Sequence, residues 1–268
     1  MRFAVLAGAL LVMPVASKAE TVSLYAAGSL KAALSEVVQA FEGQNPGKAR
    51  IETTFGASGL LRERIEKEKV AHVFASADLG HPTKLAGAGL AGSNVAVFAR
   101  NQLCALARDD LKLTPATLLD VMLDPAVRVG TSTPNADPSG DYAFALFAKA
   151  EASKPGARSV LEGKALQLTG GPTSEKAPAG RNQYAWVMEN GKADVFLTYC
   201  TNAVLARKDL PSLQIVQIAP ELNVSAEYGM IVLKDAPASA TKLAQFILGE
   251  EGQAMLVKHG FGRGNPVK

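Results

Sequence analysis

Hydrophobic residues along the chain follow two alternating patterns, short β-type runs and longer amphipathic segments of helical period. The β-type runs predict strands at residues 21–26, 49–55, 73–77, 95–107, 127–130, 194–199, 213–218 and 228–233. The amphipathic segments predict helices at residues 30–41, 58–69, 114–123, 140–152, 157–163, 182–189, 239–248 and 251–259. Because strands and helices alternate, we expect an α/β fold of mainly parallel sheets flanked by helices.

Two of the predicted strands lead into helices through turns that carry a serine. The turns are Tyr25-Ala-Ala-Gly-Ser-Leu30 and Phe55-Gly-Ala-Ser-Gly-Leu60, with Ser29 and Ser58 where each helix begins. A helix N-terminus exposes unpaired N–H groups and carries about half a positive charge. With a serine hydroxyl and small neighbours added, each turn is suited to hold an anion. The alternative is that both serines only cap their helices.

Two later segments have the same character and lie in the second half of the chain. Ser139 follows Asp137-Pro138 where one predicted helix begins, and Arg181 follows Ala179-Gly180 before another. A doubly wound sheet binds ligands at the carboxyl ends of its strands, where helix N-termini meet. Four such helix starts, spread over both halves of the chain, predict a ligand cleft between two lobes.

The first 19 residues have the pattern of a secretory signal peptide. Arg2 gives a positive start, Phe3–Val12 is an apolar run too short to span a bilayer, and small residues precede a cleavage point after Ala19. No cysteine near that point could carry a lipid. We therefore expect export to a Gram-negative periplasm as a soluble mature protein.

Charge and cysteine content narrow the possible functions further. The 268 residues include 28 basic and 25 acidic ones, and removal of the leader leaves 26 and 25, a near-neutral balance that argues against a nucleic-acid binder. Three scattered histidines and two cysteines fit no metal motif, so we expect no cofactor and no free metal cation. Cys104 and Cys200 either form a disulfide in an oxidising compartment or stay as buried thiols.

Short motifs in a specific order continue from the serine turns to the C-terminus. They are Val73-Phe-Ala-Ser-Ala-Asp78, Pro138-Ser-Gly-Asp-Tyr142, Asn190-Gly-Lys-Ala-Asp194, Tyr199-Cys-Thr-Asn-Ala203, Tyr228-Gly-Met-Ile-Val-Leu233 and His259-Gly-Phe261. With these motifs the chain resembles, over nearly its whole mature length, the periplasmic molybdate-binding proteins of ABC importers, in the type II solute-binding superfamily. The resemblance implies a two-lobed fold, no enzymatic activity, and a ligand cleft between the lobes.

The resemblance also implies a site for a tetrahedral dianion, molybdate or tungstate, held by hydroxyls and backbone N–H groups without a cation. Ser29 and Ser58 match the two serine ligands of the family, and Tyr199 matches a tyrosine beside the hinge. Ser139 stands where the family has an alanine that donates its backbone N–H. Arg181 stands about where the family has an apolar residue with the same role.

Ser139 and Arg181 are departures from the family pattern and leave the choice of anion open. A guanidinium suits sulfate, a phosphonate or a small carboxylate, unless Asp137 or Asp141 pairs with Arg181 and cancels its field. A third hypothesis is a periplasmic hydrolase with Ser29 or Ser58 as nucleophile, but no histidine lies in a triad context.

The expected organisation follows the family. Residues 20–103 with 222–268 would form one lobe, and residues 104–221 the other. The closed form, which we expect to be a monomer, would deliver its ligand to an ABC permease in the inner membrane.

Overall fold

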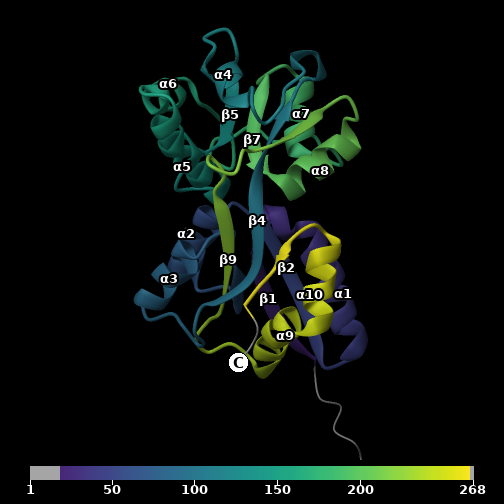
Figure 1. Cartoon of the computed structure of the whole chain (residues 1–268). Coiled ribbons are helices and arrows are strands. Elements are labelled where there is room, and N and C mark those ends of the chain that lie inside the picture. The colour runs from purple at the N-terminus through teal and green to yellow at the C-terminus, as the bar shows by residue number, and fades with distance from the viewer. Residues whose placement is uncertain (1–18, 266–268) are drawn as a thin grey trace, which may run out of the picture.

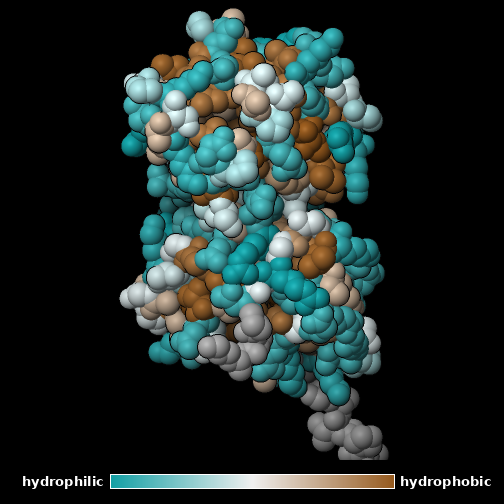
Figure 2. Space-filling view, in the orientation of Figure 1, coloured by the Kyte–Doolittle hydropathy of each residue, from teal (hydrophilic) through white to brown (hydrophobic). Residues whose placement is uncertain are grey.

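The structure, a computed structural model, describes residues 19–265 and has two α/β lobes joined at a narrow waist (Figures 1 and 2). All of the predicted signal peptide except Ala19 lies outside the described residues. Among the described residues, no helix has the length and apolar character needed to cross a membrane.

The elements of the two lobes interleave along the chain. Lobe 1 contains β1 (Glu20–Ala27), η1 (Gly28–Leu30), α1 (Lys31–Gln44), β2 (Ala49–Gly56), α2 (Ser58–Glu68), β3 (Val73–Ala75), α3 (Gly80–Gly87), most of β9 (Ser225–Val232), α9 (Ala238–Leu248), α10 (Glu250–Lys258) and β10 (Gly262–Arg263). Lobe 2 contains η2 (Asp109–Leu111), α4 (Leu118–Leu123), β5 (Val129–Ser132), α5 (Pro138–Ser153), α6 (Ala157–Lys164), β6 (Leu166–Thr169), α7 (Gln183–Glu189), β7 (Val195–Tyr199), α8 (Cys200–Asp209) and β8 (Gln214–Gln217).

One strand, β4 (Ala96–Ala107), runs through both lobes and holds them in a single curled sheet. Its residues 96–102 pair with β9, and its residues 103–107 pair with β7 and β8. The boundary expected between residues 103 and 104 therefore falls inside a continuous strand. Figure 1 shows β4 and β9 as the two connections at the waist.

Parallel pairing is confined to the outer part of each lobe. Strands β2, β1 and β3 pair in parallel in lobe 1, and β6, β5 and β7 do so in lobe 2. Every pair that involves β4 or β9 is antiparallel. The sheet is therefore more mixed than the sequence predicts, because the strands that connect the lobes return against their neighbours.

Most predicted helices and strands are present within a few residues of their expected bounds. The elements that the sequence does not predict are the short η1, η2 and β10, together with α3, β6 and α8. In α8 the inward face carries Thr201, Asn202, Ala203 and Ala206, so small and polar residues hide the apolar periodicity that normally reveals a helix.

A disulfide joins Cys104 in β4 to Cys200, the first residue of α8. The bond links residues 96 positions apart and lies within lobe 2, close to the waist. The disulfide covalently connects β4, which crosses between the lobes, to α8, which follows Tyr199. One side of the cleft is therefore held by a covalent bond.

Candidate functional site

The two serine turns lie side by side because β1 and β2 are parallel neighbours. Ala27 and Gly56, the last residues of these strands, are aligned in register. The turns that follow therefore start from the same edge of the sheet, at its carboxyl end. Ser29 lies in η1, and Ser58 is the first residue of α2.

Both hydroxyls are held by hydrogen bonds at the wall of a cavity. Ser29 Oγ lies 3.0 Å from the hydroxyl of Tyr228 in β9. Ser58 is 1% exposed, and its Oγ accepts a hydrogen bond of 3.1 Å from the Ala77 N–H. Neither side chain caps its own helix. The simple N-cap interpretation is therefore wrong for both serines.

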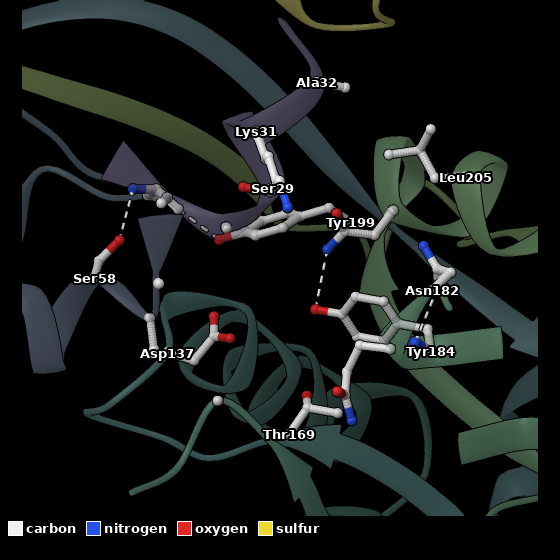
Figure 3. A pocket seen from close by; sticks show the side chains of 18 of the residues that line it. Ser29, Lys31, Ala32, Ser58, Asp137, Thr169, Asn182, Tyr184, Tyr199 and Leu205 are labelled. Atoms are coloured by element: carbon white, nitrogen blue, oxygen red, sulfur yellow. Dashed lines mark hydrogen bonds between the residues drawn. The ribbon is translucent and has the colours of Figure 1, made fainter. Parts of the chain in front are cut away.

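The cavity lies between the lobes and has a volume of about 540 Å³ (Figure 3). Lobe 1 supplies the serine turns with Lys31, Ala32, Ser35 and Ala77. Lobe 2 supplies the facing wall, which consists of Asp137, Thr169, Gly170, Arg181, Asn182, Gln183, Tyr184, Tyr199, Asn202 and Leu205. The structure thus brings Ser29, Ser58, Arg181 and Tyr199 to one cavity.

The lobes touch directly at the second serine turn. The Gly59 N–H donates to the Ala136 carbonyl oxygen at 2.8 Å, which joins the start of α2 to the loop before α5. A Cβ at position 59 would lie 2.3 Å from the Asn135 carbonyl oxygen. Only glycine allows this close approach of the two backbones.

Tyr199 ends β7 and forms part of the wall next to the waist. Its hydroxyl donates to the Ala77 carbonyl oxygen at 3.3 Å, a second contact between the lobes. The ring packs against Tyr228, with 5.5 Å between centroids, and against Tyr142, at 6.2 Å. Burial raises the pKa of the Tyr199 hydroxyl, so it stays protonated and acts as a donor.

Ser139 does not lie where the sequence predicts. Its side chain is fully buried in the first turn of α5, it is not among the residues that line the cavity, and its Oγ has no partner among the described residues. Its N–H is also used, since it donates to Asp137 Oδ1 at 3.0 Å. The backbone beside it is closely packed, since a Cβ on the next residue, Gly140, would lie 2.5 Å from the Ser132 carbonyl oxygen.

Arg181 lines the cavity, but two carboxylates already hold its guanidinium. Nε lies 3.0 Å from Asp209 Oδ2, and one terminal nitrogen lies 2.7 Å from Glu189 Oε2. The expectation that Asp137 or Asp141 pairs with Arg181 is wrong. The idea that Arg181 presents a free charge is also wrong, because Glu189 and Asp209 together neutralise it.

Asp137 is a charged cavity residue that the site prediction omits. It caps α5 by accepting the Ser139 N–H, and Gly170, with φ of +75°, packs against its carboxylate. Burial raises the pKa of Asp137 to about 6, although the hydrogen bond from Ser139 works in the opposite direction. The Asp-Pro pair at a helix start was the available signal, and it was interpreted as a possible partner for Arg181.

The rest of the lobe 2 wall is neutral and polar. The Asn202 amide donates to the Tyr184 hydroxyl at 3.1 Å, and Asn182 caps α7 (Figure 3). Burial raises the pKa of Tyr184 to about 12, so its hydroxyl stays neutral. Asn182 and Tyr184 lie in the helix predicted at residues 182–189, and Asn202 lies in the motif Tyr199–Ala203, but none of the three is predicted as a site residue.

Lys31, on the lobe 1 side, is the third charged residue that lines the cavity. It is exposed at the start of α1, and it makes no ion pair with the residues that the structure describes. Within the same described part of the chain, no group of three or more His, Cys, Asp or Glu side chains is arranged to hold a metal ion.

Two lobes joined by crossing strands, with helix starts facing a cavity between them, form the fold of the type II periplasmic binding proteins. The chain belongs to the bacterial extracellular solute-binding protein family, whose model matches residues 22–262.

Two relatives are similar in sequence. An uncharacterized protein of Pasteurella multocida, PM1146, is 34% identical over 226 residues, which cover 84% of this chain and 91% of PM1146. The molybdate-binding protein ModA of Mycobacterium tuberculosis is 24% identical over 255 residues, which cover 91% of this chain and 85% of ModA.

Two solved structures are similar in fold. The sulfate-binding protein SubI of M. tuberculosis has a TM-score of 0.72 at 18% identity, covering 90% of this chain and 86% of SubI. PEB3 bound to L-phospholactate has a TM-score of 0.68 at 13% identity, covering 90% of this chain and 99% of PEB3.

Proposed function

We propose that this protein captures a small oxyanion-bearing solute in the periplasm and delivers it to an ABC permease. The observation that carries the proposal is the pair of serine turns, which open into one cavity from the adjacent strands β1 and β2. Ser29, Ser58 and the neighbouring backbone N–H groups would bind the oxygen atoms, and Lys31 would add a positive field. The leader ending near Ala19 would direct export, and the protein would act as a monomer.

Molybdate and tungstate are the first candidate ligands, on the resemblance of the motifs and the similarity to ModA. Hydrogen bonds to a charged group stabilise by about 1.5–3 kcal/mol each. Five of them, less the cost of association, are enough for micromolar affinity, about −8 kcal/mol.

A thermal-shift panel of molybdate, tungstate, sulfate, phosphate and small carboxylates tests the proposal. An anion present at a hundredfold excess over its Kd stabilises the folded state by about 2.7 kcal/mol. The binding anion should therefore raise the melting temperature, and Ser29→Ala should reduce the shift. If no oxyanion or oxyanion-bearing compound changes the melting temperature, the proposal is wrong.

The second candidate is a receptor for sulfate, a phosphonate or a small carboxylate. The cavity volume of about 540 Å³ favours the phosphonate and the carboxylate, which are larger than a bare oxyanion, over sulfate. Because Arg181 is neutralised by Glu189 and Asp209, we expect Arg181→Ala to leave the order of anion preference unchanged. If Arg181→Ala reversed the order of anion preference, Arg181 would be the residue that determines anion specificity.

A serine hydrolase is the least supported function. A nucleophilic serine needs a base within hydrogen-bond reach. Ser29 pairs instead with a tyrosine whose pKa burial raises, and Ser58 accepts from a backbone N–H. We expect no turnover of a chromogenic ester.

A further inference from the structure

The cavity contains more space and a different chemistry than a bare tetrahedral oxyanion requires. A water molecule occupies about 30 Å³ in the liquid, so four oxygen atoms around one centre need on the order of 100 Å³. The cavity of about 540 Å³ is several times larger. The serine turns occupy one wall, and the opposite wall carries a carboxylate with neutral amides and hydroxyls.

The carboxylate of Asp137 is out of place in a site for a fully deprotonated anion. Figure 3 shows it turned toward the space between Ser58 and Tyr184. Its neighbours are the Ser139 N–H, the Ser132 hydroxyl and a second carboxylate, Asp141, with no cation among the described groups that act on it. A bare dianion would be repelled here, whereas a ligand with its own N–H or O–H group would satisfy the carboxylate.

We propose that the ligand consists of an oxyanion head joined to a short organic part, and that Asp137 accepts a hydrogen bond from a hydroxyl or ammonium group on that part. The head, a phosphate or phosphonate, binds at the serine turns of Ser29 and Ser58. The organic part lies against the lobe 2 wall, where Asn182 and Thr169 provide further polar contacts. This inference rests on the proposed function and names the class of solute that the site selects.

Matched ligand pairs test the role of Asp137. We would measure by calorimetry the affinity of the wild-type protein for 2-aminoethylphosphonate and ethylphosphonate, and for glycerol 3-phosphate and propyl phosphate. The first pair differs only in an ammonium group, and the second pair differs only in two hydroxyl groups. A hydrogen bond to a charged acceptor is worth about tenfold or more in affinity, so we expect the donor-bearing member of at least one pair to bind at least tenfold more tightly.

Variants then assign that preference to one carboxylate. Asp137→Asn keeps a side chain that can cap α5, and we expect it to reduce the tenfold preference to about twofold. Asp141→Asn is the matched control, because Asp141 lies one turn further along α5 and does not line the cavity. We expect it to leave the preference unchanged. Asp137→Ser, which also retains a capping oxygen, replaces Asp137→Asn if the latter does not fold.

The outcomes separate this inference from the proposed function. If molybdate or sulfate binds and no donor-bearing ligand binds more tightly than its partner, the inference is wrong and the proposed function stands. An undiminished preference in Asp137→Asn also overturns the inference. If no anion of any kind binds, the proposed function is wrong and the inference falls with it.

Discussion

The Gly59 N–H donates to the Ala136 carbonyl oxygen at 2.8 Å, and this bond joins a serine turn of lobe 1 directly to the loop that precedes α5 in lobe 2. The contact lies next to Ser58, so closure of the lobes would occur at the same point as the proposed anion site. Hinge closure around a ligand is the usual motion of binding proteins with this architecture. The fit at Gly59 therefore determines whether the closed cavity can form.

The first prediction concerns this contact. In Gly59→Ala the new Cβ would lie 2.3 Å from the Asn135 carbonyl oxygen, so the lobes cannot approach as closely. We expect at least a tenfold loss of affinity for the best-bound anion of the thermal-shift panel, measured by calorimetry. Gly43→Ala in α1 is the control, since a Cβ there meets nothing within 4 Å. Equal affinities for the two variants would contradict the prediction.

The two serines should differ in their effect on stability. Ser58→Ala removes the acceptor of the buried Ala77 N–H, which costs about 1–3 kcal/mol of unfolding free energy. In Ser29→Ala, Tyr228 still accepts from the Asn101 amide at 3.3 Å, and water in the cavity can take the place of Ser29 Oγ, so we expect a loss below about 1 kcal/mol. Both variants should weaken anion binding. Urea denaturation and calorimetry measure the two effects, and equal stability losses would argue against this account.

Reduction of the disulfide should destabilise the protein strongly. The bond between Cys104 and Cys200 closes a loop of 96 residues, and in the entropic model such a loop stabilises by about 4–5 kcal/mol. We expect dithiothreitol to lower the denaturation midpoint of the wild type. The double variant Cys104→Ser/Cys200→Ser serves as the control, since its midpoint should be low and insensitive to the reductant.

Asp194 should contribute to resistance against acid. Hydrogen bonds from Arg128, assisted by Arg108, lower the pKa of Asp194 to about 2, from 3.8. A lowered pKa means that the stabilisation is present above about pH 4 and is lost as the pH falls toward 2. We expect Asp194→Asn to cost about 1–3 kcal/mol at pH 7 and progressively less below pH 4. Asp110 is an exposed partner of Arg108, so Asp110→Asn should lower the unfolding free energy much less, both at pH 7 and below pH 4.

Asp137 should have the opposite pH dependence. Burial raises its pKa from 3.8 to about 6, so between these values the folded protein binds more protons than the unfolded chain. The stability of the wild type in the absence of ligand should therefore fall as the pH rises from about 4 to about 6. Asp137→Asn removes this titration. In urea denaturation, the unfolding free energy of the variant relative to that of the wild type should therefore be higher at pH 7 than at pH 4. A constant difference between the two proteins would contradict the assigned pKa.

The fold was largely predictable because it depends on local patterns. Alternating β-type runs and amphipathic segments, such as residues 49–55 followed by 58–69, specify strand–helix units without reference to the rest of the chain. Helix α8 escaped prediction because its buried face uses Thr201 and Asn202, whose partners lie on other elements. The antiparallel pairing of β4 and β9 could not be predicted either, since nothing in a strand's own sequence determines the direction of the neighbouring strand.

By itself, the sequence determined that Ser29 and Ser58 stand where helices follow strands, and parallel pairing of those strands then makes the two turns neighbours. Only the tertiary structure decided which residues of lobe 2 line the opposite wall of the cavity. There, Ser139 is buried in α5, two distant carboxylates pair with Arg181, and Asp137 lines the cavity instead. The physical reason is that a turn's conformation is a local property, whereas the orientation, burial and charge pairing of a side chain depend on residues far away along the chain.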